Sequence, residues 1–424
     1  MNSNKNVLLI TYYWPPSGGA GVHRWLRFSK YFTQQNINLT VYCPSQAAWP
    51  IIDEELHDQI PSGLTVIRRK IFEPHKFLGK SNSKGVGFTE NKKRSLIQKF
   101  IVWVRGNLFI PDSRIFWIRP STRFLSKYLK EHPEINTIIS TGPPHSMHLI
   151  ANNLKKKHNF RWLADFRDPW TQIDFYHDLL PGRRADRKHR RLEKLCLTNS
   201  DEVITISDSC SAGLKKIVDR EIHVITNGYD FPEFDSNEII LDNKFTISHF
   251  GSMPFTRNPL VLWKALSELI SENSEFREHL CINLVGIVDY KVIDSAIENG
   301  LKEFMSVIPP VKHSKSIALQ RTSQLLLLAA NNTGNVKGIL TGKFFEYLGA
   351  KRPIIAIGMK NSDLEVAMKT TNGGFFSDFN DKLNLKESLE ASFRHYQSRN
   401  LFCQAVALEQ FNSKNLASKF IELL

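Results

Sequence analysis

The stretch GILTGKFFEYLGAKRPIIAIG, from Gly338 to Gly358, places a turn, a helix and a strand in close succession. Thr341 and Gly342 make the turn, and residues 343–350 have apolar side chains at helical spacing. A proline then precedes the apolar run 354–357, which is typical of a central strand in a parallel sheet. The order of loop, helix and strand predicts an α/β domain in which the loop leads directly into the helix N-terminus.

The start of this predicted helix is suited to a phosphate group. A helix N-terminus offers unpaired N–H groups and the positive end of the dipole, and Gly342 lets the backbone approach a ligand. Lys343 and Glu346 share one helix face, so a cation for phosphate lies beside a carboxylate for sugar hydroxyls. This pattern favours a nucleotide-sugar site. A surface helix with an ion pair between the same two residues is the alternative that the spacing leaves open.

Length and charge limit the classes of protein. The 424 residues are too many for one ordinary core and predict two domains of roughly 200 residues each. The hydrophobic content of 42% is sufficient for packed α/β cores. The formal net charge of +14 indicates an anionic partner, which can be nucleic acid, an anionic lipid surface or a phosphorylated substrate.

Cysteine usage and the apolar segments indicate where the protein works. The five cysteines are scattered and form no CxxC pair, as expected of a reduced intracellular protein without a disulfide framework or a zinc module. The sequence contains neither a signal peptide nor an apolar stretch of ~18 residues that could span a membrane. We therefore expect a soluble or peripheral protein.

The first half of the chain opens with a predicted βαβ unit. The apolar run 7–11 predicts a central strand, residues 12–21 (YYWPPSGGAG) a loop, and residues 23–32 a helix that leads to a second strand. The loop then lies at the carboxyl end of the sheet, where ligands bind. It contains Gly18 and Gly19, but the spacing is not GxGxxG and does not support a dinucleotide site. A tight turn is the alternative role of these glycines.

Two further predicted strands of the first half lead to polar residues. Residues 135–140 predict a strand, and the turn TGPPHS after it places His145 at the start of a helix, on the ligand side of the sheet. A lone loop histidine is otherwise a surface or capping residue. Residues 161–166 predict the next strand, and its carboxyl end has three charged residues that can bond acceptor hydroxyls or hold the loop by ion pairs: Asp165, Arg167 and Asp168.

Two basic segments of the first half indicate an anionic surface. Residues 45–95 are predicted to be irregular, and they end in the basic triplet 92–94, which precedes the aromatic-rich residues 95–119. Such a segment can lie in a membrane interface or form a core helix with a solvated flank. Residues 182–197 predict a strongly basic helix, which suits acidic lipid head groups or a solvated face. Nucleic acid is not expected as a partner, because no aromatics interleave this helix and no nucleic-acid motif surrounds it.

The second half repeats the architecture of the first. Residues 245–250 predict a strand, followed by the loop GSMPFTRNP that begins at Gly251 and by a helix from Leu260. Arg257 is the loop's only cation, and its guanidinium can bind phosphate in bidentate fashion; an exposed loop arginine is the alternative. Later apolar runs predict further strands, and residues 384–424 predict terminal helices.

Five segments, in this order along the chain, resemble the family 4 (group 1) glycosyltransferases. They are WPPSGGAGVHR, ADFRDPW, HVITNGYD, GSMPFTRNP and GKFFEYLGAKRPIIAIG. The resemblance implies the GT-B fold, which has two Rossmann-like, doubly wound parallel-sheet α/β domains that face a cleft. We place the acceptor-side domain at residues 1–230, a linker at 231–243, the donor domain at 244–400, and a terminal helix that packs back on the first domain at 401–424.

The resemblance also implies roles for individual residues. The glycine pair of the first loop approaches the donor phosphates or the acceptor, Glu346 holds the ribose, and His145 faces the reacting sugar or the acceptor hydroxyl. Arg257 and Lys343 stabilise the charge that develops on the leaving diphosphate, as preorganised cations do. Where the family has a first donor-site glutamate, this sequence has Gly338, so the carboxylate that usually binds the donor sugar comes from elsewhere or is absent. The residues expected to bind the donor are Gly18, Gly19, Gly251, Gly342 and Glu346.

The expected activity is that of a hexosyltransferase in cell-surface polysaccharide biosynthesis. It moves a sugar from a nucleotide-diphosphate sugar to a saccharide or lipid-linked acceptor, and the resemblance implies retention of anomeric configuration and no metal or other cofactor. The expected location is cytoplasmic or peripheral on the inner face of the plasma membrane, where an anionic membrane surface is a further partner. The alternatives are a nucleotide-sugar epimerase or phosphorylase of the same fold, and a non-catalytic basic protein that binds nucleic acid or anionic lipid.

Overall fold

The computed structural model describes residues 5–424 except 75–95, 174–175, 231–238, 334–335 and 339. The chain divides into two compact units, one made of residues 1–228 with 413–424 and the other of residues 229–412. Most of the predicted linker, the basic triplet 92–94 and one residue of the stretch 338–358 lie outside the described residues.

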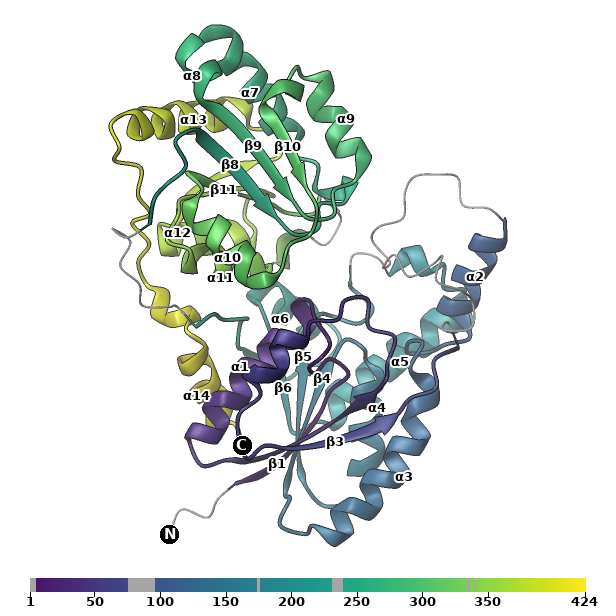
Figure 1. The fold of residues 1–424 in the computed structure, drawn as a ribbon. Helices are drawn as coiled ribbons and strands as arrows, with labels where there is room; N and C mark the ends of the chain where they lie inside the picture. The colour runs from purple at the N-terminus through teal and green to yellow at the C-terminus, as the bar shows by residue number, and fades with distance from the viewer. Residues whose placement is uncertain (1–4, 75–95, 174–175, 231–238, 334–335, 339) are drawn as a thin grey trace. The chain divides into compact units, whose positions relative to one another are not determined.

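The first unit is built on a sheet of seven parallel strands (Figure 1). Their spatial order is β3-β2-β1-β4-β5-β6-β7, and each neighbouring pair is parallel. The strands are β1 (Asn6–Ile10), β2 (Asn38–Ser45), β3 (Thr65–Lys70), β4 (Thr137–Gly142), β5 (Arg161–Phe166), β6 (Glu202–Thr205) and β7 (His223–Val224). The helices are α1 (Ala20–Gln34), α2 (Leu96–Asn107), α3 (Ile115–Glu131), α4 (Ser146–Lys155), α5 (Arg183–Asn199), α6 (Asp208–Lys215) and α14 (Ser413–Glu422), with 3-10 turns η1 (Glu54–Gln59) and η4 (His177–Leu179).

The prediction that residues 45–95 are irregular was wrong for part of that segment. Strand β3 pairs along its whole length with β2. It is an edge strand whose side chains are only partly buried, and its sequence TVIRRK has two arginines in place of a continued apolar run. An edge strand has one unpaired side and needs little apolar sequence, so its hydrophobic signal is weak.

The core of the first unit lies on both faces of the sheet. The central strand β1 is buried on both sides, with Val7 and Leu8 in different hydrophobic clusters. One cluster packs the sheet against α3 and α4, and the other packs it against α1 and α14. On the latter face the returning helix α14 lies beside α1, where the ring of Phe420 meets that of Trp25 at 5.0 Å.

The second unit has a sheet of six parallel strands with the same winding. Their spatial order is β10-β9-β8-β11-β12-β13. The strands are β8 (Phe245–Phe250), β9 (Leu280–Val285), β10 (Met305–Ile308), β11 (Leu325–Ala329), β12 (Ile354–Gly358) and β13 (Gly374–Asp378). The helices are α7 (Leu260–Glu272), α8 (Ser274–His279), α9 (Tyr290–Glu298), α10 (His313–Thr322), α11 (Gly342–Gly349), α12 (Asp363–Thr371) and α13 (Lys382–Gln397), with 3-10 turns η6 (Phe255–Arg257), η7 (Lys302–Phe304), η8 (Val336–Gly338) and η9 (Leu408–Phe411).

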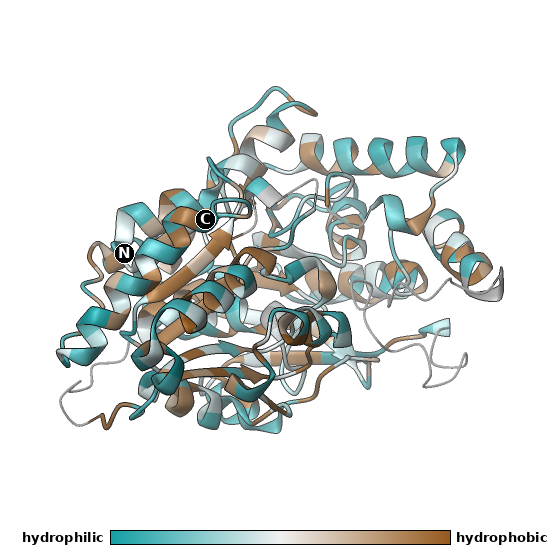
Figure 2. Ribbon diagram, turned by 90° about the horizontal axis from the view of Figure 1, so that it is seen from above, coloured by the Kyte–Doolittle hydropathy of each residue, from teal (hydrophilic) through white to brown (hydrophobic). Residues whose placement is uncertain are grey.

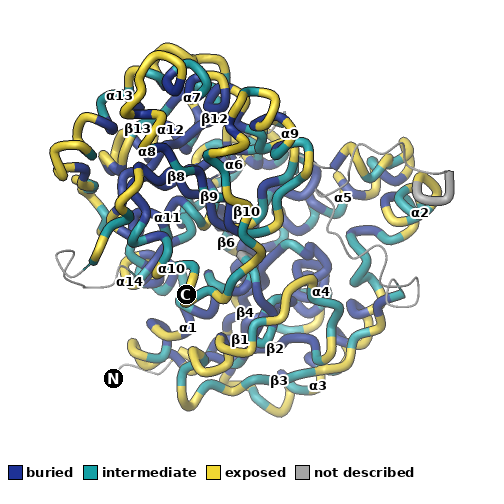
Figure 3. The backbone as a smooth tube through the Cα atoms, turned by 45° about the horizontal axis from the view of Figure 1, so that its top comes forward, coloured by how far each residue is buried: buried dark blue, intermediate teal, exposed yellow. Residues whose placement is uncertain are grey.

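Both units are doubly wound. In the second unit, one cluster packs α7, α9 and α13 on one face of the sheet, and another packs α11 and α12 on the opposite face. The central strands are buried, whereas the helices alternate hydrophobic and hydrophilic residues along their length (Figures 2 and 3). None of the helices in the described part of the chain is both long and apolar enough to cross a membrane.

The strand order gives each unit one topological switch point. The winding reverses between β1 and β4 in the first sheet and between β8 and β11 in the second. In open α/β sheets, ligands bind beyond the carboxyl ends of the strands at such a point. The loops after these four strands are therefore where a site is expected.

Candidate functional site

The switch point of the second unit is made of backbone in close contact. The loop after β8 begins at Gly251, whose φ of +98° is rare for residues with a side chain. A Cβ at this position would lie 2.8 Å from Cε of Lys343. Gly286 directly follows the next strand, β9, and a Cβ there would lie 2.2 Å from the carbonyl oxygen of Gly251. Both glycines therefore allow the strand ends to approach each other, and Gly251 leaves the space that the Lys343 side chain occupies.

Lys343 lies over this loop from the first turn of α11. Its Nζ donates a hydrogen bond to the carbonyl oxygen of Ser252 at 3.2 Å and is 3.3 Å from Nε2 of His249, the buried histidine near the end of β8. Burial, together with the positive charge of Arg257, lowers the pKa of Lys343 to about 7, while Glu346 acts in the opposite direction. The amine is thus held in place, and it changes charge near neutral pH.

Arg257 joins the same carbonyl group from the 3-10 turn η6. Its Nη1 donates to the oxygen of Ser252 at 3.2 Å, and its Nε donates to Oδ1 of Asn331 at 2.6 Å. Asn331 lies in the loop after β11, so Arg257 connects the two loops of the switch point. Two cations from separate elements thus converge on one carbonyl oxygen, which is the arrangement that a group of concentrated negative charge requires.

The N-terminus of α11 is the third part of this site. Gly342 is exposed, and a Cβ there would have no heavy atom within 4 Å. Oγ1 of Thr341, the N-cap residue, is buried without a hydrogen-bond partner among the described residues. One turn further along the helix, Oε1 of Glu346 lies 3.0 Å from Nε2 of His313 at the start of α10. Gly338, where the family has a glutamate, is buried in η8.

In the first unit, His145 lies at the N-cap of α4, beyond the end of β4. Its ring stacks on Trp170 at a centroid distance of 4.8 Å, and its Nδ1 is buried without a partner in the described part of the chain. Burial lowers the pKa of His145 well below its usual range, and the nearby His148 and Arg167 lower it further. The imidazole is therefore neutral at physiological pH, with a ring nitrogen that can serve as an acceptor or donor for a ligand.

Arg167 holds the two loops of this switch point together. Its Nη1 donates to the carbonyl oxygen of Gly21 at 2.8 Å, and its Nη2 donates to that of Pro143 at 2.6 Å. Its Nε is buried without a partner among the described atoms. Arg167 is thus beside His145 but bonded to backbone, whereas Asp168 after it is only partly buried. The structure brings His145 and Arg167 together at the first unit's ligand end.

Asp165 has the surroundings of a structural ion pair. Its side chain is fully buried and accepts hydrogen bonds from Nε and Nη2 of Arg24 at 3.2 and 3.1 Å, from Nε1 of Trp25 at 2.8 Å and from Oγ1 of Thr141 at 2.9 Å. These contacts tie β5 to α1 and β4. Of the two roles that the sequence left open for Asp165, the geometry favours the ion pair that holds the loop.

The local backbone explains why residues 18 and 19 are glycines. A Cβ at Gly18 would lie 2.8 Å from Cγ2 of Ile51, and the N–H of Gly18 donates to the oxygen of Ile51 at 3.0 Å. Gly19 has a φ of +84° at the N-cap of α1. The tight turn that the sequence left open is therefore present, and it places the N-terminus of α1 at the end of β1.

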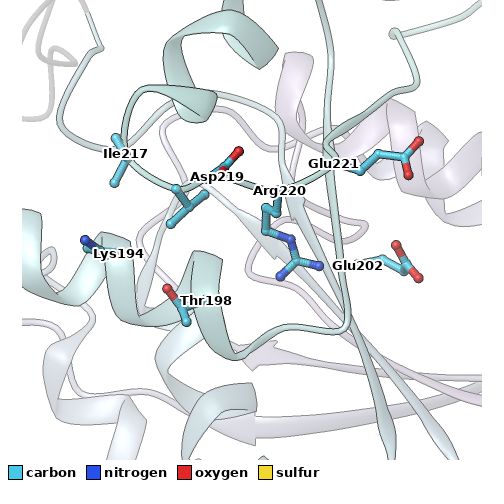
Figure 4. Close-up of a pocket in the computed structure, with 8 residues that line it drawn as sticks. Lys194, Thr198, Glu202, Ile217, Asp219, Arg220 and Glu221 are labelled. Carbon is cyan, nitrogen blue, oxygen red and sulfur yellow. The ribbon is translucent and has the colours of Figure 1, made fainter.

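A cavity lies elsewhere on the first unit (Figure 4). It has a volume of about 450 Å³ and is lined by residues of α5, β6 and the segment after α6, among them Lys194, Arg220 and Glu202. Glu202 is the first residue of β6, so the cavity is at the amino end of the sheet, opposite the ligand end. Arg220 donates to backbone carbonyl groups there, which gives it a structural role. In the described part of the chain, no three His, Cys, Asp or Glu side chains are grouped so that they could hold a metal ion.

The structure thus brings together some predicted residues and adds others. Gly251, Arg257 and Lys343 converge at the second switch point, and Gly342 and Glu346 lie on the same short helix. Four site residues were not predicted, namely His249, Ser252, Asn331 and His313. His249 had a weak signal, since it is a polar residue inside an apolar strand next to a glycine loop. Ser252, Asn331 and His313 reach the site only through the packing of separate segments, and they have no local sequence signal.

Comparison with known proteins rests on structure. No family model matches the sequence, and no curated protein matches it. A glycosyltransferase from Rickettsia africae has a TM-score of 0.59 and 13% identity, covering 99% of this chain and 94% of that one. TarM of S. aureus, solved as a variant with UDP bound, has a TM-score of 0.59 and 12% identity, covering 99% of both chains.

A third solved structure is that of a putative UDP-N-acetylglucosamine 2-epimerase from Listeria monocytogenes. It has a TM-score of 0.54 and 11% identity, covering 99% of this chain and 95% of that one. Identities this low establish the fold alone. The two doubly wound sheets, together with likeness to glycosyltransferases over nearly whole chains, show that this chain has the GT-B fold.

Proposed function

We propose that the protein is a glycosyltransferase that takes its sugar from a nucleotide-diphosphate donor bound by the second unit. The observation that supports this proposal most is the convergence of Lys343 and Arg257 on the carbonyl oxygen of Ser252, at the switch point of a doubly wound sheet. Breaking the sugar–phosphate bond develops negative charge on the leaving diphosphate. Preorganised cations stabilise such charge because they need no reorganisation during the reaction.

The remaining residues of the site in the second unit orient the donor. The exposed N-terminus of α11 at Gly342 offers backbone N–H groups to the diphosphate. Glu346, held by His313, accepts hydrogen bonds from ribose hydroxyls. Gly338 supplies no carboxylate for the donor sugar, so we propose that this sugar is held by other groups than in the family that the sequence resembles.

For the first unit, we propose that His145 contacts the donor sugar or the acceptor hydroxyl. Its neutral ring is held by the stack on Trp170, and its unpartnered Nδ1 gives it a polar atom for a ligand. The acceptor is a saccharide or a lipid-linked saccharide of cell-surface polysaccharide. The resemblance supports retention of anomeric configuration without a metal ion, and the alternative of an epimerase is supported by the fold that the chain shares with the Listeria protein.

An activity assay separates these alternatives. The full chain is incubated with UDP-, GDP- and ADP-sugars, with and without a lipid and oligosaccharide extract of bacterial envelopes. A transferase releases nucleoside diphosphate only when acceptor is present, and Lys343→Met abolishes the release. An epimerase converts the donor sugar without acceptor, and a non-catalytic protein produces neither result.

Mass spectrometry and NMR of the product then test the anomeric configuration, and a chelator tests whether a metal ion takes part. Retention predicts an α-linkage from an α-linked donor. If no metal takes part, an excess of EDTA leaves the rate within about twofold of the untreated rate. A rate that falls to zero with EDTA and returns with a divalent cation would contradict that part of the proposal.

We further propose that the first unit binds anionic membrane surface through α2 and α5. The exposed aromatic rings of Phe100 and Trp103 stack on each other on α2 at 6.2 Å and are 64% and 44% exposed. Large exposed aromatic patches mark interaction sites. The neighbouring helix α5 has exposed cations along its length and one acidic residue in its first turn: Arg183, Arg184, Arg187, Lys188, Arg190, Arg191, Lys194 and Asp186.

The two helices are held together firmly. A Cβ at Gly106 of α2 would lie 2.0 Å from the oxygen of Leu179, so this position requires glycine for close packing. Asn107 bonds to the backbone just before α5, donating to the carbonyl oxygen of Leu180 at 3.0 Å and accepting from the N–H of Gly182 at 2.7 Å. The helix with the exposed aromatic rings thus packs at its C-terminal end against the start of the basic helix, and aromatic rings and cations together suit the head-group region of an anionic bilayer.

Vesicle binding tests this surface. We expect co-sedimentation with phosphatidylglycerol vesicles but not with phosphatidylcholine vesicles, and a loss of binding for Phe100→Ser with Trp103→Ser. Each cation near the surface contributes about 1 kcal/mol, so Arg187→Ser with Arg191→Ser weakens binding by tenfold or more. The matched control Phe402→Ser removes another exposed aromatic, 57% exposed, in the second unit. Equal binding of wild type and both double variants would contradict the proposal.

A further inference from the structure

His249 is a buried polar residue whose two ring nitrogens have separate partners. Its Nδ1 lies 3.0 Å from the carbonyl oxygen of Leu327 on β11. A carbonyl only accepts, so Nδ1 carries the hydrogen, and Nε2 of the neutral ring is left as an acceptor. Nε2 lies 3.3 Å from Nζ of Lys343. The strand pair β8–β11 therefore fixes the tautomer that lets the histidine accept a hydrogen bond from the lysine.

This contact orients the amine of Lys343. Two of its hydrogens are directed to Nε2 of His249 and to the carbonyl oxygen of Ser252. The amine form then has a lone pair in the remaining direction, whereas the ammonium form has a third N–H there. Only the ammonium form can donate to a phosphate oxygen in that direction.

Burial and the charges around Lys343 decide whether the amine or the ammonium form is present. The groups that face it are Arg257 of η6, Glu346 of α11 and the neutral His249 of β8. Burial lowers the pKa of Lys343 to about 7, and burial together with Lys343 lowers the pKa of His249 well below its usual range. Above neutral pH, the site without ligand therefore holds a neutral lysine beside a neutral histidine.

We propose that His249 is a positioning residue that holds the amine of Lys343 in the diphosphate site, and that the ligand's diphosphate is bound together with one proton taken up by that amine. The inference rests on the proposed function, because it concerns the same nucleotide-diphosphate site. The step is a protonation: the lone pair of the lysine amine takes a proton from solvent, and the new N–H donates to a phosphate oxygen. Above neutral pH, Lys343 then becomes positively charged when the ligand binds.

Calorimetry of binding to the full chain measures this proton directly. UDP-glucose and GDP-mannose are used as probes, because a diphosphate linked at both ends has no phosphate group that titrates near neutral pH. Titrations at about pH 8 in two buffers of different ionisation enthalpy give the number of protons bound per ligand. We expect a proton uptake approaching one, and an affinity that falls as pH rises through the Lys343 pKa.

Variants separate the role of His249 from a purely structural one. Lys343→Arg keeps a fixed charge, so binding should take up no proton. His249→Leu removes the acceptor, which stabilises the ammonium more than the amine, so the midpoint of the pH profile should move to lower pH and affinity should fall about tenfold. His249→Gln places an amide oxygen near the position of Nε2 and should restore the wild-type midpoint. Thermal unfolding of each variant without ligand shows whether it is folded.

The outcomes are distinguishable. Binding without proton uptake, or a pH profile that is the same in wild type and His249→Leu, would overturn this inference and leave the proposed function intact. If neither nucleotide sugar binds, the donor site fails, and this inference fails with it.

Discussion

At the scale of single residues, Gly251 is the position whose replacement most directly tests the geometry of the site. Gly251→Ala should cost about 1–2 kcal/mol because of its positive φ, and it should also displace Lys343, whose Cε would be 2.8 Å from the new Cβ. Gly300→Ala is the matched control, because its φ is +76° and a Cβ there meets nothing within 4 Å. Both variants should unfold at slightly lower temperature, but only Gly251→Ala should lose nucleotide affinity. Equal affinity in the two variants would show that Lys343 does not bind the ligand.

Asp165 provides a second test at this scale. Asp165→Asn leaves the buried guanidinium of Arg24 without its counter-ion, so we expect a loss of about 3–5 kcal/mol in the free energy of unfolding. Urea unfolding followed by tryptophan fluorescence measures it, since all eight tryptophans except Trp263 lie in the first unit. Glu131→Gln breaks the exposed ion pair with Lys127 and should cost less than about 1 kcal/mol. A small effect of Asp165→Asn would indicate a carboxylate that is free to bind an acceptor.

The sequence predicted single residues best where the chemistry is local. Lys343 and Gly342 could be found because a glycine and a cation start a helix, and Arg257 because it is the only cation of its loop. Asn331 and His313 could not be found, since each reaches its partner only after distant segments have packed together. The burial of Asp165 could not be predicted either, because its partner Arg24 is far away in the chain.

At the scale of elements, the returning helix α14 makes a prediction about stability. Phe420 is fully buried against α1, in ring contact with Trp25 and Phe28. Phe420→Ala should lower the free energy of unfolding of the first unit by about 3–5 kcal/mol, through lost burial and the cavity left behind. Phe402→Ala, at a residue 57% exposed, should have an effect of less than about 0.5 kcal/mol. Similar effects of the two substitutions would mean that α14 does not hold α1.

Elements with a strong hydrophobic period were predictable, and those without one were not. Strands β5 and β8 have the predicted bounds, because each is a short segment with several apolar residues followed by a loop that contains a proline. Strand β3 was missed because two arginines end its apolar run at the edge of the sheet. The basic helix α5 was predicted as a helix, but only the structure shows that its start packs against the end of α2.

At the scale of the whole molecule, the two sheets repeat the same order of strands. Both sheets have the same winding, so each unit has a ligand end at its switch point, and the predicted glycine loops lie at both. The alternation of strands and helices was sufficient to predict this architecture. The sequence could not indicate which charged residues of the two units are bonded internally, because that depends on packing between segments far apart in the chain.

The central claim is that the second unit binds a nucleoside diphosphate through Lys343 and Arg257. The most direct test is the unfolding temperature of the full chain with UDP, GDP, ADP or CMP. A ligand at 100 times its dissociation constant stabilises the folded state by about 2.7 kcal/mol, which raises the unfolding temperature by a few degrees. The control Lys264→Met with Arg277→Gln removes an exposed cation of α7 and another of α8, and so keeps the same change in net charge.

We predict that one nucleotide raises the unfolding temperature of the wild type and of this control, and that Lys343→Met with Arg257→Gln abolishes the rise. The absence of any rise with all four nucleotides, or an equal rise in both double variants, would contradict the central claim.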